Sequence, residues 1–185
     1  MQGIPVSQSR VRLAQLMTPN DANVLGNVFG GSILALIDLA ASSVAQKFSG
    51  HVCVTAAFDR VDFHNPIEIG MLVELDGVVS YVGRTSLEVT IDVYATRLTK
   101  NERHHVNTAR VTMVAIENGK PVPVPRLICE TREDKLRFLS GQLRRELKAQ
   151  RTEQMATLTQ KLEQFPDDKL MELINSTTPL VAQLT

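Results

Sequence analysis

The stretch from Thr18 to Phe48 contains the side chains of this chain that are best suited to catalysis. Its first part, up to Gly31, is a polar loop with four closely spaced side chains that can form hydrogen bonds: Asn20, Asp21, Asn23 and Asn27. Its second part is apolar on nearly every side, and its only charges are Asp38 and Lys47. A helix that is apolar all round is normally buried, and a buried carboxylate needs a partner. Asp38 is therefore the first candidate for a reacting group.

The neighbours of Asp38 on a helix leave room for another molecule. Most residues three, four and seven positions away are small: Gly31, Ala35, Ala41, Ser42 and Ala45. Gly30 and Gly31 open the helix, where backbone N–H groups lack helical partners and the helix dipole is positive. A desolvated carboxylate together with free N–H donors indicates acyl-transfer chemistry, with the Gly31 N–H as oxyanion donor. The alternative is an aspartate that caps or bridges elements inside a core.

Composition and charge narrow the class of protein. The 185 residues include 20 basic and 20 acidic side chains, so nothing indicates nucleic acid as the main partner. Cys53 and Cys129 have neither a CxxC nor a zinc-like spacing and are interpreted as reduced thiols, with one disulfide as the alternative. The adjacent His104 and His105 would point to opposite faces of a strand, so we assign no metal.

The location of the protein is predicted from what its ends and apolar segments lack. The N-terminus has no signal-peptide pattern. The apolar stretch around Asp38 is too short to span a bilayer. We therefore expect a cytoplasmic protein with no membrane partner.

One long helix and five strands are predicted to position the polar loop and Asp38. Strands are expected at 11–17 before the loop, and at 52–63, 71–82, 84–98 and 104–117 after the helix. This order predicts an antiparallel sheet wrapped around a single helix, an α+β arrangement. One helix on one curved sheet makes a modest core, so we expect an oligomer that covers more apolar surface.

A helical extension is predicted after the proline-rich segment that ends at Pro125. Thr131 and Asp134 form the pattern of a capping box, and leucines at helical spacing follow: Leu136, Leu139, Leu143 and Leu147. The chain thus divides into residues 1–128, with the sheet and central helix, and residues 129–185, the helical extension and tail. We expect the leucine stripe to pack on a neighbouring subunit. The alternative is that the basic residues of this helix hold a ligand's phosphates.

Several blocks of the chain resemble a known family. The segment PNDANVLGNVFGGSILALID is similar to the signature of hotdog-fold acyl-CoA thioesterases, in the branch of small bacterial acyl-CoA hydrolases and brain acyl-CoA hydrolase. The segments VDFHNPI, YVGRTSLEV and MVAIENGKPVPVP resemble later blocks of the same family, in the same order. The resemblance runs from about Val11 to Pro125 and implies a hotdog fold.

The resemblance also implies an activity and a site. Members hydrolyse acyl-CoA to a free fatty acid and coenzyme A, with an aspartate and an asparagine from opposing units of a dimer; these correspond to Asp38 and Asn23. Asp38 would act as general base or as nucleophile, and Asn23 would orient the water or the thioester. An Asx turn could instead explain Asn23, but we expect Asn20 and Asn27 to shape the loop. Members usually assemble as trimers of dimers, and no cofactor is implied beyond the coenzyme A of the substrate.

The same resemblance indicates where coenzyme A binds. The residues concerned are Gly83, Arg84, Thr85 and Ser86, with His64 and Lys120 as weaker candidates. Two other functions are weighed against hydrolysis. A hotdog hydratase needs a histidine paired with a carboxylate, and no histidine lies on the predicted helix. A non-catalytic acyl-CoA-binding regulatory protein would need neither Asp38 nor Asn23.

Overall fold

The computed structural model describes residues 2–59, 61–62 and 65–184. The chain forms two compact units, Met1–Gly141 and Gln142–Thr185, called the sheet unit and the C-terminal unit from here on. No helix among the described residues is long and apolar enough to cross a membrane.

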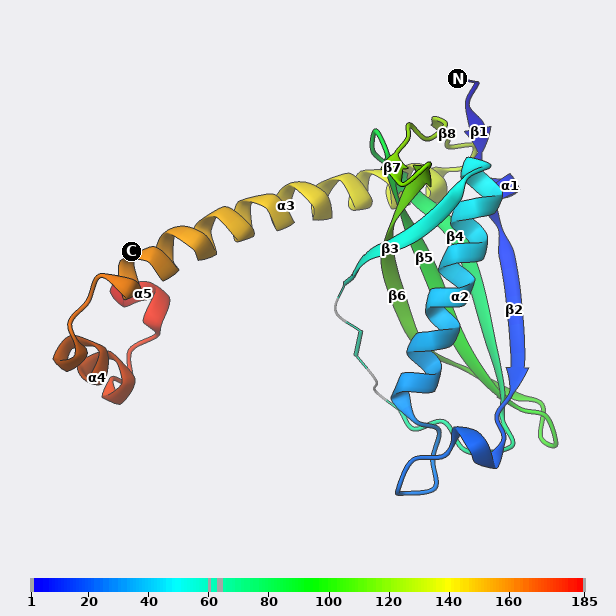
Figure 1. Cartoon of the computed structure of the whole chain (residues 1–185). Helices are drawn as coiled ribbons and strands as arrows, with labels where there is room; N and C mark the ends of the chain where they lie inside the picture. Colours follow the sequence, from blue (N-terminus) through cyan, green and yellow to red (C-terminus); the bar gives the residue numbers. More distant parts are fainter. Residues whose placement is uncertain (1, 60, 63–64, 185) are drawn as a thin grey trace. The chain divides into compact units, whose positions relative to one another are not determined.

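The sheet unit is built on one antiparallel sheet (Figure 1). Its strands are β2 (Val11–Leu16), β3 (Val52–Phe58), β4 (Leu72–Val82), β5 (Ser86–Arg97), β6 (Glu102–Glu117) and β7 (Lys120–Pro121). Their order is β2-β4-β5-β6-β3, and β7 pairs with β6. The long hairpins follow from the alternation of apolar and polar residues, because every second side chain of a strand faces the core. On β5 the buried residues of this pattern are Leu87, Val89, Ile91 and Val93.

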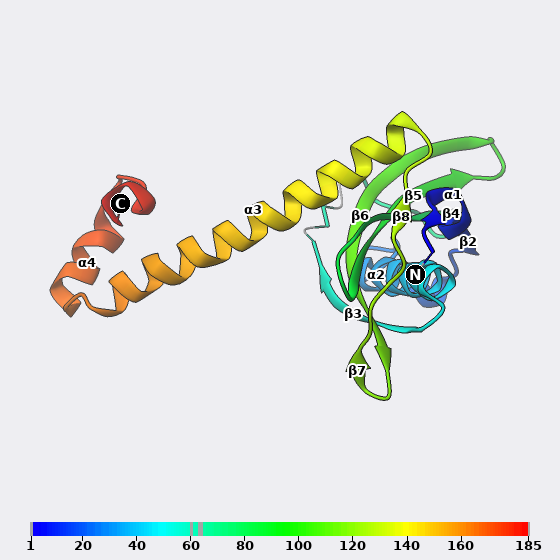
Figure 2. The same cartoon turned by 90° about the horizontal axis from the view of Figure 1, so that it is seen from above.

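Helix α2 (Gly30–Ser49) supplies the other half of the core. The sheet curls around it, as Figure 2 shows. Ile33, Ile37, Val44 and Phe48 are almost fully buried against the sheet. The approach is close at Gly77 on β4, where a Cβ atom would lie 2.7 Å from Val44. The predicted antiparallel sheet around a single helix is confirmed.

One expectation about α2 is wrong for the isolated chain. The helix was predicted to be buried on all sides, but Ala35 is exposed and 62% of the Leu39 surface is accessible. Asp38 is only partly buried as a result. The physical reason is that one sheet covers one side of a helix, so the second apolar side has no cover within the chain.

The first residues pack beside the sheet, which the sequence pattern did not predict. β1 (Ile4–Pro5) pairs in parallel with β8 (Leu127–Ile128), and α1 (Val6–Ser9) follows. The Ser9 hydroxyl is buried and accepts a hydrogen bond of 3.0 Å from the Val79 N–H of β4. This bond ties the N-terminal turn to the middle of the sheet.

The helical extension begins as predicted. The capping box before α3 (Arg132–Glu163) is formed: the Thr131 N–H donates to Asp134, and the Asp134 N–H donates to the Thr131 hydroxyl. The start of α3, which belongs to the sheet unit, packs on the sheet with the Phe138 and Tyr81 rings 5.0 Å apart. α4 (Asp167–Asn175) and α5 (Leu180–Leu184) complete the C-terminal unit.

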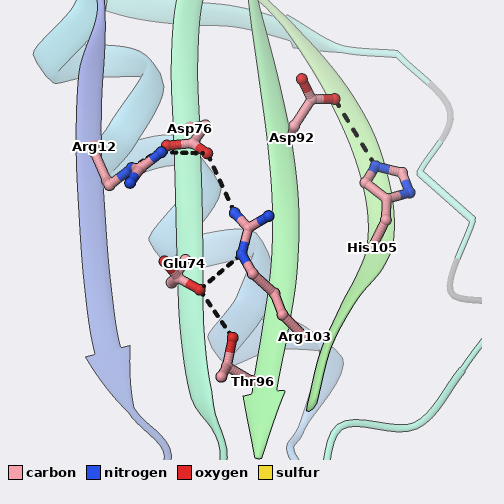
Figure 3. Close-up of polar contacts among 7 residues, drawn as sticks. All are labelled: Arg12, Glu74, Asp76, Asp92, Thr96, Arg103 and His105. Carbon is pink, nitrogen blue, oxygen red and sulfur yellow. Dashed lines mark hydrogen bonds and ion pairs between the residues drawn. The ribbon is translucent and has the colours of Figure 1, made fainter. Parts of the chain in front are cut away.

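The sheet face that points away from α2 carries a network of charged side chains (Figure 3). Arg103 donates to Glu74 at 3.0 Å and lies 3.4 Å from Asp76, which also pairs with Arg12. The Thr96 hydroxyl donates to Glu74 at 2.9 Å. The hydrogen bond from Thr96 and the adjacent Arg103 outweigh burial and hold the pKa of Glu74 below its usual value.

Glu74→Gln tests the stabilising effect of this network. A carboxylate with a lowered folded pKa stabilises the protein above its unfolded pKa of about 4.3, and this stabilisation is lost as the pH falls through the folded value. We expect the substitution to lower the free energy of unfolding at pH 7 by about 1 kcal/mol. The difference from the natural protein should shrink below about pH 4. Urea denaturation at both pH values measures this.

Glu117→Gln, at the exposed end of β6, is the matched control and should change little at either pH. An equal loss for Glu74→Gln at both pH values would show that the carboxylate charge does not contribute.

Candidate active site

The loop before α2 is held by its own polar groups. A 3-10 turn, Pro19–Asp21, begins it. The Asp21 carboxylate accepts hydrogen bonds from the Thr18 N–H and hydroxyl, at 2.9 and 2.8 Å. These bonds lower the pKa of Asp21. At the other end the Phe29 N–H donates to the Asp21 carbonyl at 2.7 Å. Asp21 therefore closes the loop at both ends.

Asn23 shapes the tip of this loop. Its side-chain oxygen accepts hydrogen bonds from the Leu25 N–H, at 2.9 Å, and from the Asn27 N–H, at 3.2 Å. The expectation that Asn20 and Asn27 rather than Asn23 form the Asx turns is thus wrong. Asn23 forms the Asx turn because it directly precedes the backbone N–H groups that need an acceptor. With its oxygen occupied, Asn23 has its side-chain NH₂ group as its remaining means of contacting a ligand.

Next to Asn23 the loop tip presents apolar side chains to solvent. Val24 and Leu25 are 101% and 82% exposed. Gly26 follows with a positive φ of 80°, which suits glycine. Exposed apolar side chains at a loop tip are costly unless a partner covers them.

Gly31 lies in the first turn of α2. Its N–H precedes the first bonded donor of the helix, Ser32, which donates to the Phe29 carbonyl at 2.9 Å. A Cβ atom at Gly31 would lie 2.2 Å from the Phe29 ring, so glycine is the residue that leaves this ring in place. The helix start therefore offers N–H donors at its positive end, beside the exposed Phe29 ring.

Asp38 accepts a hydrogen bond from a residue that the sequence analysis missed. The Thr55 hydroxyl, on β3, donates to Asp38 Oδ1 at 2.5 Å and lies 3.5 Å from Met113 Sδ. Thr55 thereby fixes one carboxylate oxygen and leaves the other for different contacts. The sequence signal was a polar residue two positions after the buried Cys53, on the face of a strand that should meet the helix.

A single chain does not bring Asn23 and Asp38 into contact. Asp38 is seven residues beyond Gly31, roughly 10 Å along the helix, and Asn23 lies in the loop before the helix start. No hydrogen bond joins Asn23 to Asp38 or Thr55 among the described residues. A site that uses Asn23 and Asp38 together would therefore need a second chain.

The candidate coenzyme A residues lie at the other end of the sheet. Gly83–Ser86 form the turn between β4 and β5, closed by the Gly83 N–H to the Ser86 carbonyl at 2.7 Å. The polar loop instead joins β2 and α2 at the opposite end (Figure 1). The Arg84 side chain is exposed, and the backbone carbonyl of Arg84 accepts a hydrogen bond of 3.0 Å from the Val124 N–H.

Of the two weaker candidates, the structure describes Lys120. Lys120 is exposed and begins β7, just after a tight Asn118–Gly119 turn in which both residues have positive φ. His64 lies outside the described residues. No group of three potential metal ligands occurs in the part of the chain that the structure describes.

Comparison with known proteins shows which family the chain belongs to. The profile of the thioesterase superfamily matches residues 25–100. The uncharacterized acyl-CoA thioester hydrolase YkhA of Bacillus subtilis is 39% identical over 128 residues, which are 69% of this chain and 74% of that protein.

Solved structures of acyl-CoA thioesterases are similar to this chain. An apo-hexameric acyl-CoA thioesterase superposes with a TM-score of 0.79 at 38% identity, covering 82% of this chain and 98% of the other. The acyl-CoA hydrolase of Staphylococcus aureus, solved with butyryl coenzyme A and coenzyme A, superposes with a TM-score of 0.76 at 30% identity, covering 87% and 99%. The chain belongs to the acyl-CoA thioester hydrolases of the hotdog-fold thioesterase superfamily.

Proposed function

We propose that this protein hydrolyses acyl-CoA at a site shared by two chains, with Asp38 from one chain and Asn23 from the other. The observation that carries the proposal is the position of Asp38. It is fixed by Thr55 of the edge strand β3 and lies at the border of the side of α2 that the sheet leaves uncovered, where Leu39 is exposed.

The edge strand β3 supports a dimer as the catalytic unit. It ends the sheet order, and its sequence VCVTAAF contains neither a charge nor a proline that would protect a free edge. Val52, Val54 and Phe58 expose 59%, 43% and 37% of their surfaces. Pairing of β3 with β3 of a second copy would satisfy the free backbone groups, and α2 packing on α2 would cover Leu39. The exposed Val24 and Leu25 would then contact the second chain, and this contact would place the neighbouring Asn23 next to it.

Residue spacing in a relative gives further support. Solved variants of the Staphylococcus aureus acyl-CoA hydrolase replace an asparagine, an aspartate and a threonine by alanine, fifteen and seventeen residues apart in order. Asn23, Asp38 and Thr55 have the same two spacings. The match includes Thr55, which only its contact with Asp38 had indicated.

The chemistry assigns each group a role. Asp38 takes a proton from a water molecule that attacks the thioester carbonyl carbon, or attacks that carbon itself to form an anhydride that water then opens. The C–S bond breaks, and the sulfur of coenzyme A leaves with a proton. The Gly31 N–H donates to the oxyanion that develops on the carbonyl oxygen. The NH₂ group of Asn23 orients the water or the thioester.

Coenzyme A is assigned to the turn Gly83–Ser86, where a guanidinium and two hydroxyls can donate to phosphates. Lys120 and His64 are the weaker members of this proposed site. Because a relative of 38% identity is hexameric, we propose a trimer of dimers for this chain. A cytoplasmic location and the absence of a further cofactor stay predictions.

Asp38→Asn tests the proposed base. The amide keeps the size of the side chain but cannot accept a proton, so we expect thiol release from acyl-CoA to fall by ~10²-fold or more. The Asn23→Ala variant should lose thiol release by a similar factor. Asp167→Asn, on the exposed start of α4, is the matched control and should keep full activity. If the natural protein releases no thiol while acyl-CoA raises its melting temperature, a non-catalytic acyl-CoA-binding protein replaces this proposal.

Mixing two inactive variants tests whether the site is shared. A dimer with one Asn23→Ala chain and one Asp38→Asn chain contains one site with both natural residues and one with neither. Equal amounts that are unfolded and refolded together should therefore recover about a quarter of the natural activity, because half of the dimers are mixed. If the mixture stays as inactive as its components although mass spectrometry detects mixed dimers, Asn23 and Asp38 act within one chain.

Thr55→Val and Thr55→Ser test the hydrogen bond to Asp38. Valine removes the hydroxyl and keeps the shape, so we expect kcat to fall by ~10-fold or more while KM changes little, since the carboxylate loses its fixed orientation. Serine retains the donor and should keep most of kcat. Equal kcat values for valine and serine would remove Thr55 from the proposed mechanism.

A further inference from the structure

Strand β3 contains a β-bulge directly after Thr55. In the pairing of β3 with β6, Thr55 lies opposite Met113, whereas Ala57 lies opposite Thr112. β3 therefore has one residue more than β6 at this point, and Ala56 is the extra residue. A bulge changes which side chains of a strand point to which face, and bulges are frequent beside active sites.

The bulge places Phe58 on the same face of the sheet as Thr55. Side chains directly opposite each other in an antiparallel pair lie on one face, and Phe58 is opposite Val111. Val111, like the Met113 opposite Thr55, is fully buried in the core that the sheet forms with α2. Without the extra residue, Ala57 would be opposite Val111, and Phe58 would point away from α2.

The contact between α2 and β3 is closed at one end and open at the other. At the end of α2, Ser49 Oγ lies 3.2 Å from Cys53 Sγ, and both residues are buried. From there β3 runs away from α2 (Figure 1). Thr55 is exposed, and 37% of the Phe58 surface is accessible. A substrate group that starts at Asp38 can therefore extend towards Phe58 but not towards Cys53.

The coenzyme A arm of the substrate is expected at the closed end. In the proposed function coenzyme A is assigned to the turn Gly83–Ser86. Within one chain this turn lies beside the start of β3. The Thr85 carbonyl accepts a hydrogen bond of 3.1 Å from the Ala115 N–H, and Ala115 is opposite Cys53. The acyl chain is bonded to the other side of the thioester carbonyl carbon, so the open end of β3 is available to it.

We propose that Phe58 contacts the acyl chain of the substrate and sets a preference for chains long enough to reach its ring. This inference rests on the proposed function, in which the thioester reacts at Asp38. Phe58 is three residues from Thr55, which is up to about 10 Å along the strand. An acetyl group cannot span this distance, whereas a chain of roughly eight or more carbons can, with C–C bonds of about 1.5 Å. Contact between such a chain and the ring removes apolar surface of both from water.

Thiol release from butyryl-CoA and dodecanoyl-CoA by the Phe58→Ala variant tests this contact. The natural protein should have the higher kcat/KM for dodecanoyl-CoA. Alanine removes the ring, so we expect kcat/KM for dodecanoyl-CoA to fall by ~10-fold or more. The value for butyryl-CoA, whose chain is too short to reach position 58, should stay within about twofold and shows that the variant is folded. A natural protein that prefers butyryl-CoA, or a variant with an unchanged ratio of the two values, would overturn the inference.

Two further variants of β3 control for the face of the sheet. Val54 is also exposed and apolar, but it is opposite Val114, on the face that points away from α2. Val54→Ala should therefore leave the ratio of the two kcat/KM values unchanged. Ala57→Phe combined with Phe58→Ala moves the ring by one position, to the face of Thr112, and should not restore the turnover of dodecanoyl-CoA. Restoration by the moved ring, or an equal change of the ratio in Val54→Ala, contradicts the assigned face.

Binding measurements separate this inference from the proposed hydrolysis. Butyl and dodecyl thioethers of coenzyme A have no thioester carbonyl and cannot be hydrolysed. By isothermal titration calorimetry, the natural protein should bind the dodecyl thioether ~10-fold more tightly than the butyl thioether, and Phe58→Ala should lose most of this difference. If this result is obtained with a protein that releases no thiol, the inference stands and the proposed hydrolysis fails. If thiol is released but Phe58→Ala keeps the difference in affinity, the inference fails and the hydrolysis stands.

Discussion

Helix α2 is apolar on two sides, and one sheet can bury only one of them. The side with Ile37 and Val44 fills the concave face of the sheet, while Leu39 stays open to solvent beside Asp38. The same shortage of cover recurs at the unprotected edge of β3 and at the tip formed by Val24 and Leu25. In the proposed function, a second chain would cover this side, exclude water from the Asp38 carboxylate and strengthen its interactions.

The two polar side chains of the candidate site are held in the same way. The side-chain oxygen of Asn23 accepts hydrogen bonds from the loop backbone, and one oxygen of Asp38 accepts a hydrogen bond from Thr55. Each side chain is held at one atom and presents another. Fixing a reactive group before the substrate arrives lowers the cost of reaching the transition state, since less order must be imposed during the reaction.

Most of the fold could be predicted, because its signals are local. The alternation from Leu87 to Val93, the glycines at the start of α2 and the capping box at Thr131 each depend on neighbours in sequence. The contacts of the candidate site could be predicted only in part. Asn23 and Asp38 were named, but the Asx turn of Asn23 depends on which N–H groups the folded loop turns inward, and Thr55 matters only because β3 lies beside α2. Tertiary geometry decides such contacts, and spacing in one sequence does not report it.

The contact between Gly31 and Phe29 affects how this protein can evolve. Every residue other than glycine would push a Cβ atom into the Phe29 ring. Because 58% of the Phe29 surface is exposed, the ring can turn away to admit a Cβ atom, and a smaller residue at position 29 would remove the clash altogether. Selection acts on the two positions as a pair, so substitutions at Gly31 should be found most often together with substitutions at Phe29 across related sequences.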